Sequence, residues 1–278
     1  MHRTQKYSLR LRVSAVQIIL VTAALVAVAP FLWLLSTSFK GSEELFAFPP
    51  TIIPRTFNFE NYSGVWNAVP FGAYMVNSII VVMASIVLNV GVGSLAGFAL
   101  ARYRFRGRGM LFFLVLAAMM IPKEVIIIPL YTTVLKMRLA DTLAGVVLPF
   151  AVEGFGIFMM RQAFLAIPKE IEEAGVMDGA SPLRLWWNVM LPMTKPSLAA
   201  LTIFTFIGTW GDFLWPLVVL KSQEHYTLQV GLSYMIGAFA DNYRYVAAGA
   251  VLAVVPVIVV FVAMQNYFER GLFAGAGR

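Results

Sequence analysis

Four ionisable side chains interrupt apolar stretches of this sequence and are the first candidates for chemistry. They are Lys123, Glu124, Glu153 and Asp212. Carboxylates inside a membrane relay ions, pair with a cation, or accept hydrogen bonds from the hydroxyl groups of a solute. The residues are widely separated along the chain, so the elements that carry them must bring them together.

Cysteine and histidine chemistry is excluded by the composition. The chain has no cysteine, and its two histidines are His2, near the terminus, and His225, in a polar stretch. A disulfide framework, a thiolate site, a His-based zinc site or a His-containing triad therefore cannot be built. There is also no G-x-x-x-x-G-K-[ST] phosphate loop, so any ATP chemistry belongs to another chain. A membrane-embedded enzyme is the least favoured class of function.

The composition is that of a membrane protein with several spans. Of the 278 residues, 60% are apolar and 13% are charged, against about 45–50% and about 25% in soluble domains. A membrane-spanning helix needs about 20 mainly apolar residues. Six segments fit this length, at residues 13–39, 71–101, 110–135, 142–160, 198–220 and 245–268. The sequence therefore predicts an all-α integral membrane protein with six transmembrane helices.

The basic residues predict the orientation of these helices. If both termini are cytoplasmic, inside segments hold 14 Lys and Arg residues and outside segments hold 6. The positive-inside rule favours this arrangement. It also explains the net charge of +7 without a nucleic-acid partner. Residues 40–70 then form an outer segment, and their aromatic residues predict that it lies along the membrane interface.

The charges within the spans have two interpretations. With a helical rise of about 1.5 Å per residue, Lys123 and Asp212 lie in the outer half of the membrane, and Glu153 lies near its middle. In the first interpretation, Glu153 and Asp212 line a translocation path for a hydroxyl-rich solute, and Trp210 and Phe213 add flat apolar faces. In the second, the charged groups bond to neighbouring helices, for example Asp212 to Lys123.

Residues 161–197 form the most polar long segment of the chain, on the predicted cytoplasmic side. Pro168 and the acidic residues after it predict a short helix. The dipeptide Asp178-Gly179 predicts a turn. Ser181 and Pro182 then predict the start of a second helix. The segment should form a helix–turn–helix elbow beneath the membrane.

The elbow resembles the EAA motif of ABC importer permeases. The resemblance is carried by Glu172-Glu173-Ala174, Asp178-Gly179-Ala180 and Leu191-Pro192. Two further stretches, Pro49-Pro50 to Asn61-Tyr62 and Trp210 to Pro216, are similar to the carbohydrate branch related to the maltose permease subunit MalG. The sequence departs from the family pattern at Gly175, in place of the second Ala, and at Gly211. Gly175 should loosen the first elbow helix by about 1 kcal/mol relative to Ala.

This resemblance implies a fold and an assembly. Residues 1–278 would form a single transmembrane domain of the type I ABC importer permease fold, in a bacterial-type inner or plasma membrane. Residues 161–197 would be the cytoplasmic coupling loop that docks on an ATP-binding subunit. The residues implied in that contact are Glu172, Glu173, Ala174, Asp178, Gly179 and Ala180.

The implied partners are a second permease subunit in a heterodimer, two ATP-binding subunits, an extracytoplasmic solute-binding protein and membrane lipid. No cofactor is expected on this chain, because ATP and Mg would be bound by the ATP-binding subunits. An ion-gradient-driven secondary transporter, with Glu153 and Asp212 as an ion relay, is the alternative. It would leave the elbow without a purpose.

Overall fold

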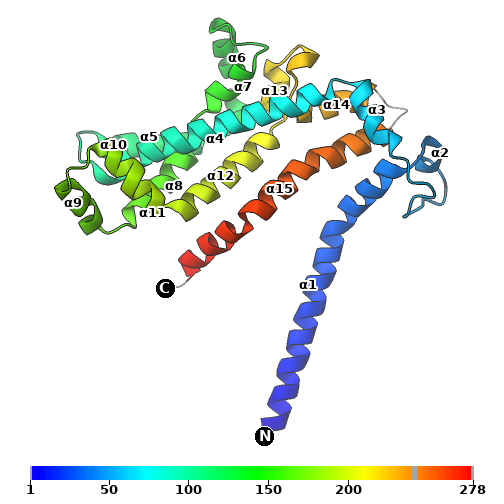
Figure 1. Cartoon of the computed structure of the whole chain (residues 1–278), viewed down its shortest axis with the longest axis horizontal. Coiled ribbons are helices and arrows are strands. Elements are labelled where there is room, and N and C mark those ends of the chain that lie inside the picture. Colours follow the sequence, from blue (N-terminus) through cyan, green and yellow to red (C-terminus); the bar gives the residue numbers. More distant parts are fainter. Residues whose placement is uncertain (1, 239–242, 277–278) are drawn as a thin grey trace. The chain divides into compact units, whose positions relative to one another are not determined.

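The computed structural model describes the backbone of residues 2–238 and 243–276, and the side chains of residues 16–237 and 243–265. The two ends predicted to be cytoplasmic, residue 1 and residues 277–278, lie outside the described residues. Every element of the described chain is helical (Figure 1). The long helices are α1 (His2–Phe39), α4 (Phe71–Arg102), α12 (Lys195–Trp210) and α15 (Tyr243–Ala276).

Shorter helices make up the rest of the described chain. Before α12 they are α2 (Ser42–Leu45), α3 (Glu60–Ala68), α5 (Arg108–Met119), η1 (Lys123–Ile126), α6 (Ile127–Lys136), α7 (Leu143–Val147), η2 (Leu148–Phe150), α8 (Gly154–Leu165), α9 (Lys169–Met177), α10 (Pro182–Arg184), η3 (Leu185–Met190) and α11 (Leu191–Met193). After α12 they are α13 (Leu214–Val219), η4 (Gln223–His225) and α14 (Leu228–Ala238).

The described residues contain three helices that are long and apolar enough to cross a membrane. They are Val16–Phe39, Phe71–Arg102 and Tyr243–Gln265. Three bent pairs of helices raise the number of spans to as many as six if each pair is one span. The pairs are Arg108–Met119 with Lys123–Lys136, Leu143–Phe150 with Gly154–Leu165, and Pro182–Met193 with Lys195–Trp210. The predicted all-helical membrane fold is confirmed.

The sharpest bend divides the predicted span at 110–135. The axes on the two sides of the break differ by 93°. Pro122 stands at the break, and its backbone is extended (φ −60°, ψ 136°). Because proline has no backbone N–H, the hydrogen bonding of α5 cannot continue through this residue. Lys123 then begins a single 3-10 turn. The ionisable residues at 123 and 124 therefore lie in a helix break rather than in a continuous helix.

The predicted span at 198–220 is also divided, and here the prediction of one continuous helix is wrong. Helix α12 ends at Trp210, and α13 begins only at Leu214. Glycine is a poor helix former, and Gly211 directly follows the last helical residue. The carboxylate of Asp212 accepts the backbone N–H of Trp215 at 3.4 Å, which gives the chain a local alternative to the helical bond. Asp212 is thus placed in the break.

The described chain divides into two compact units. The first comprises Met1–Val69 and Tyr234–Val254. In it, the outer segment folds back on the end of α1, where the buried side-chain amide of Asn61 donates to the carbonyl oxygens of Ser38 and Lys40, both at 2.9 Å. The ring of Phe39 packs edge-on against that of Phe59, with centroids 5.2 Å apart.

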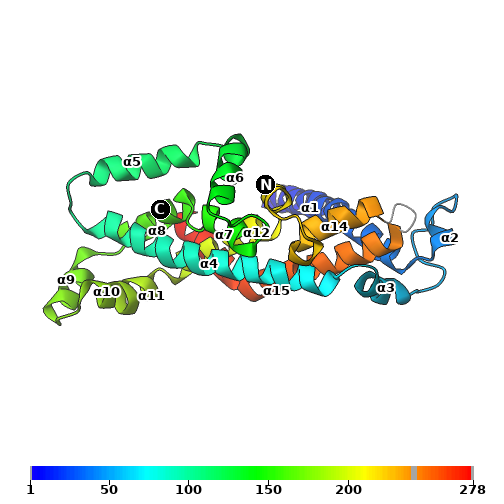
Figure 2. The same ribbon diagram turned by 90° about the horizontal axis from the view of Figure 1, so that it is seen from above.

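The second unit comprises Pro70–Ser233 and Val255–Arg278. Within it, α4 runs alongside α8 and α12, and α5 lies against α8 (Figure 2). Gly97 is a point of close approach between α4 and α8, because a Cβ atom there would lie 2.8 Å from the backbone nitrogen of Arg161. Phe98, Met160, Phe164 and Leu201 form much of the buried cluster between these helices.

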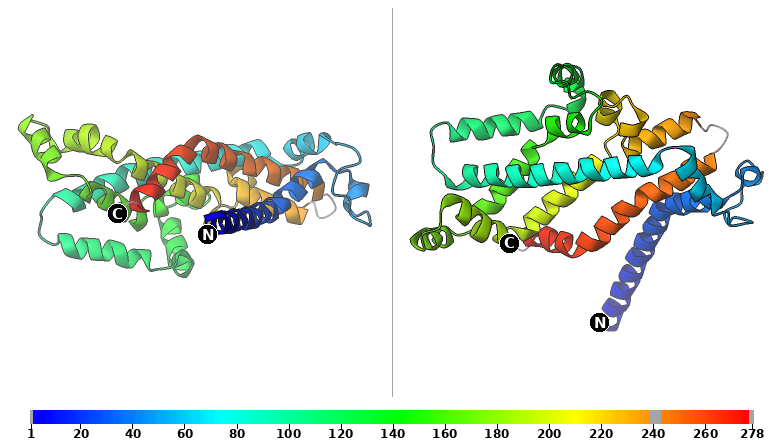
Figure 3. Two further views of the ribbon diagram at one scale, coloured as in Figure 1. Left: turned by 90° about the horizontal axis from the view of Figure 1, so that it is seen from below. Right: turned by 45° about the horizontal axis from the view of Figure 1, so that its top comes forward.

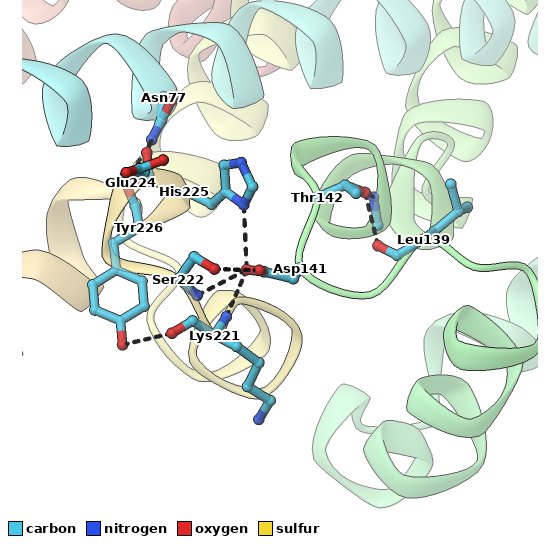
Figure 4. A network of polar contacts seen from close by, with 10 residues as sticks. Asn77, Leu139, Asp141, Thr142, Lys221, Ser222, Glu224, His225 and Tyr226 are labelled. Atoms are coloured by element: carbon cyan, nitrogen blue, oxygen red, sulfur yellow. Dashed lines mark hydrogen bonds and ion pairs between the residues drawn. The ribbon is translucent and has the colours of Figure 1, made fainter.

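Two loops of the second unit are joined by the carboxylate of Asp141 (Figure 4). It accepts the backbone N–H groups of Lys221 at 2.8 Å and Ser222 at 2.9 Å, and the hydroxyl of Ser222. Nδ1 of His225 lies 3.3 Å from Asp141 Oδ1. Burial alone would raise the pKa of Asp141, but these hydrogen bonds outweigh it and hold that pKa well below its usual range.

Candidate functional site: a polar cavity and a helical elbow

A small cavity of about 90 Å³ opens among α4, η2, α12 and the breaks that carry the ionisable residues. Its polar lining comes from five segments of the second unit. The polar residues are Ser85, Asn89, Lys123, Glu153, Thr205, Thr209 and Asp212, with Gly208 beside them. The structure therefore brings together three of the four ionisable residues that the sequence singled out.

Lys123 and Glu153 form an ion pair at the cavity, with Nζ and Oε1 2.6 Å apart. The side chains are 55% and 36% exposed in this chain, so the pair is accessible rather than sealed. The ammonium group also lies 4.8 Å from the ring centroid of Phe150, a cation–π contact. The second interpretation of the sequence, in which the charged groups bond to neighbouring helices, suggested Asp212 as the partner of Lys123. In the structure the ion-pair partner of Lys123 is Glu153.

Asn89 is the central polar residue of the cavity, and sequence reasoning missed it. Its side chain is 1% exposed. The amide oxygen accepts the backbone N–H of Glu153 at 3.0 Å, and the amide nitrogen donates to the hydroxyl of Thr205 at 2.9 Å. The available signal was Ser85 and Asn89, four residues apart and so on one face of a mainly apolar helix.

The aromatic residues expected beside Asp212 are placed differently. Asp212 and Gly208 line the cavity together, but Trp210 and Phe213 do not belong to the lining. Trp210 is 6% exposed and stacks on Phe206 with ring centroids 5.6 Å apart. Phe213 is exposed elsewhere. The flat apolar surfaces of the cavity come from Phe150 and Phe204 instead.

The elbow has the predicted helix–turn–helix form and lies at the C-terminal end of α4 (Figure 3). Helix α9 ends at Met177, and Gly179 turns the chain with φ of +76°, a conformation that favours glycine. The side chain of Ser181 accepts the N–H of Arg184 at 3.4 Å and so caps the second helical run, Pro182–Met193. Residues Leu185–Met190 of that run have π-helical hydrogen bonding.

The tip of the elbow presents apolar and acidic side chains. Val176, Met177 and Leu183 are 58%, 82% and 64% exposed, and Glu173 is exposed beside them. Ala174, Asp178 and Gly179 are exposed as well, whereas Ala180 is half-buried. Large apolar side chains exposed close together in the sequence of a polar segment are typical of a protein-binding site.

Glu172 differs from its neighbour Glu173 because it turns toward the chain. Its carboxylate lies 3.4 Å from Nε of Arg102. Gly175 also faces inward, and a Cβ atom there would lie 2.8 Å from Cδ1 of the buried Leu185. Gly175 therefore does more than loosen α9. Because it has no side chain, the buried side chain of Leu185 can pack against α9 at this position.

The geometry agrees with what comparison with known proteins shows. Residues 89–274 match the family described as the binding-protein-dependent transport system inner membrane component. The chain belongs to this family. It is a multi-pass inner-membrane permease subunit of an ATP-driven importer, and ATP is hydrolysed on a separate subunit. The alternative of an ion-gradient-driven transporter is thereby set aside.

The chain is similar to permeases along almost its whole length. It is 37% identical to the arabinooligosaccharides transport system permease protein AraQ of Halalkalibacterium halodurans, with 91% of each chain covered. It is 32% identical to the sn-glycerol-3-phosphate transport system permease protein UgpE of Escherichia coli, with 90% of this chain and 94% of that protein covered.

A solved structure confirms the fold. The chain superposes on a subunit of a bacterial ABC transporter involved in the import of the acidic polysaccharide alginate, with a TM-score of 0.85 and 28% identity. The superposition covers 93% of this chain and 97% of that one. The expected permease fold, that of an ABC importer, is confirmed.

Proposed function

We propose that this chain and a second permease subunit form the path by which a sugar or sugar-like solute enters the cell. The complex would be a heterodimer of permeases with two ATP-binding subunits, and an extracytoplasmic solute-binding protein would deliver the solute. In this arrangement residues 1–278 act as one transmembrane domain, and residues 40–70 lie along the outer interface.

The solute class is supported by the cavity chemistry together with the relatives. Asn89, Thr205 and Thr209 offer neutral hydrogen-bonding groups, and Glu153 and Asp212 offer carboxylate acceptors. Such a mixture suits hydroxyl groups, which both donate and accept. The relatives named above transport arabinooligosaccharides and sn-glycerol-3-phosphate, and the solved transporter imports alginate. All three solutes are rich in hydroxyl groups.

The coupling role is carried by one observation, the exposed apolar and acidic tip of the elbow. Met177 and Leu183 are largely exposed on a pair of short helical runs, and Ser181 caps the second of them. We propose that residues 161–197 are the cytoplasmic coupling loop and that this tip docks in a groove of an ATP-binding subunit. Glu173 and Asp178 then make polar contacts with that subunit, and nucleotide-driven closure pulls the elbow.

Gly179→Trp in the reconstituted complex tests this role. A Cβ atom at Gly179 would meet nothing within 4 Å in this chain, so a bulky side chain there interferes chiefly with a docked partner. The complex should assemble and hydrolyse ATP, and solute uptake per ATP should fall roughly tenfold or more, as expected for a lost coupling between sites.

Gly107→Trp is the matched control. Gly107 also has a positive φ (+85°) and also has open space around a Cβ atom, but it lies in the loop before α5. It therefore reproduces the backbone strain of the Gly179 variant without touching the elbow. Full uptake by Gly179→Trp in an assembled complex, or equal losses in the two variants, would contradict the coupling role.

A further inference from the structure

The guanidinium group of Arg102 joins three helices at one point. Arg102 is the last residue of α4, and its side chain is 4% exposed. Nη2 donates to the carbonyl oxygens of Phe164 and Ile167, at 2.6 Å each, and Nε lies 3.4 Å from Oε2 of Glu172. The two carbonyls lie at the C-terminal end of α8 and just after it, and Glu172 lies in the first turn of α9 as an ion-pair partner.

The chemistry of this contact suits arginine. Carbonyl groups at a helix C-terminus carry partial negative charge and attract a cation. A planar guanidinium group has five N–H donors in a fixed fork, so it can reach two carbonyls and a carboxylate at once. The compact ammonium group of lysine cannot match that geometry. Arg102 therefore fixes α9 to the ends of α4 and α8 as a single polar joint.

Helix α4 and the residue just before α8 also contribute polar groups to the cavity. Asn89 lies 13 residues before Arg102 on α4, roughly 20 Å along the helix axis. Its side chain bonds to the N–H of Glu153, just before α8, and to Thr205 of α12. Between the two joints, Gly97 holds α4 against the backbone of α8 without space for a methyl group. Close-packed helices of this kind transmit a displacement rather than absorb it.

We propose that Arg102, paired with Glu172, is the positioning residue that makes α9, α4 and α8 move as one body during transport. The proposal rests on the coupling role proposed for the elbow. A displacement of α9 moves Asn89 and Glu153 at the cavity, because the guanidinium group connects α9 to α4 and α8. Without the contacts of Arg102, α9 moves with the ATP-binding subunit, and the cavity residues keep their positions.

Three variants of the complete reconstituted complex separate this role from a general loss of charge. Arg102→Gln removes the joint. Glu172→Gln removes only the ion pair and leaves both carbonyl bonds in place. Arg106→Gln, the matched control, removes the same charge from an exposed residue of the neighbouring loop. For each, uptake and ATP hydrolysis stimulated by the binding protein are measured together.

Arg102→Gln should lower uptake per ATP roughly tenfold, within the range that couplings between sites usually reach. Glu172→Gln should lower it less, and Arg106→Gln should leave it unchanged. A residue with a merely structural role would reduce the amount of assembled complex and leave the uptake per ATP of the remainder at the normal value.

A distance measurement reports the joint directly. Because the chain has no cysteine, spin labels can be placed at Val92 of α4 and Glu170 of α9, both exposed and both outside the docking tip. In the wild-type background the distance between the labels should be the same in the nucleotide-free and ATP-trapped complexes. With Arg102→Gln it should change or broaden on ATP trapping.

Normal uptake per ATP in both Arg102→Gln and Glu172→Gln, with an unchanged label distance, would overturn the proposal. If Arg102→Gln fails to assemble, Glu172→Gln decides, because it retains the bonds to Phe164 and Ile167. Failure of the underlying coupling role has a different signature, since uptake would then tolerate Gly179→Trp whatever happens at Arg102.

Discussion

Nζ of Lys123 lies 2.6 Å from Oε1 of Glu153, and each residue stands where a bent pair of helices is broken. The pair joins the turn η1 to the residue that precedes α8. Each side chain is the nearest charge of opposite sign for the other. Removal of one partner leaves the other without its ion pair, whereas removal of both leaves neither group unpaired.

We therefore expect Lys123→Met and Glu153→Gln each to lower the thermal stability of the purified complex. The double variant should lose less stability than the sum of the two single losses. The interaction energy from this double-mutant cycle should be about 0.5 kcal/mol or more, as for residues in contact. Strictly additive effects would show that the two groups do not interact.

Asp212→Asn tests whether the break after α12 belongs to the solute path. The amide can still accept the N–H of Trp215, so the local fold should persist. Loss of the charge should change the apparent affinity or selectivity for sugars in uptake assays, with normal assembly. Loss of assembled complex with unchanged selectivity would indicate a structural residue instead. Glu224→Gln, in an outer loop, provides a comparison for removal of an acid.

The hydrogen bonds to Asp141 predict how the two outer loops respond to acid. The folded protein holds the pKa of Asp141 well below the usual value, which is about 3.9 for an unperturbed Asp. A depressed pKa means that the stabilisation is complete above the unfolded value and is lost as the pH falls through the folded one. Between pH 7 and 5 this carboxylate should therefore keep its bonds.

Amide hydrogen exchange at Lys221 and Ser222 measures this effect. Their protection factors should stay constant down to about pH 4 and fall below it. Asp141→Asn preserves a side chain that tolerates the positive φ of +57° at this position. It should lower protection at pH 7 by roughly tenfold, the loss expected for a bond to a charged group. It should also remove the acid dependence, and an unaltered acid response in this variant would contradict the assignment.

Gly97 and Gly91 of α4 form a matched pair for testing the contact between α4 and α8. A Cβ atom at Gly97 would lie within 3.0 Å of three atoms of α8, whereas one at Gly91 would meet nothing within 4 Å. Gly97→Ala should lower the melting temperature of the complex because the helices must separate. Gly91→Ala should be neutral or stabilising, by up to about 1 kcal/mol, from helix propensity. The reverse order would exclude close packing at Gly97.

The distribution of basic residues predicts that both termini are cytoplasmic. Cysteines introduced at Ser8 and Gly275 should react with an impermeant thiol reagent only after the membrane is opened. The absence of native cysteine makes any labelling specific. Modification of either position in intact cells would reverse the topology.

The elbow could be predicted from the sequence because its signals are local. Gly179, Ser181 and Pro182 each act on the backbone within a few residues, and the structure shows the turn and cap that they predict. Asn89 could not be predicted in the same way. Its partners are 64 and 116 residues away, and an Asn in a mainly apolar helix does not indicate which helices it will meet.

The end of α12 at Trp210 could not be predicted from the hydropathy of the sequence. The apolar run continues through Leu214 to Leu220, so a window of about 20 residues reads it as one span. Backbone chemistry at Gly211 and Asp212 ends the helix instead, and this break carries Asp212 to the cavity. The sequence thus singled out Glu153 and Asp212 as candidates for one path, but it did not predict that both would lie at interruptions between helices.

During biosynthesis, an unpaired lysine within the bilayer is costly, up to about 2.5–3.5 kcal/mol at the centre of a membrane-spanning helix on insertion scales. Lys123 and Glu153 lie on consecutive bent pairs and neutralise each other when those pairs are adjacent. Release of the first pair into lipid before the second has been synthesised would leave the ammonium group without its carboxylate. The ion pair therefore favours insertion of residues 108–165 as one hairpin, after translation of Glu153, over entry of the two pairs in succession.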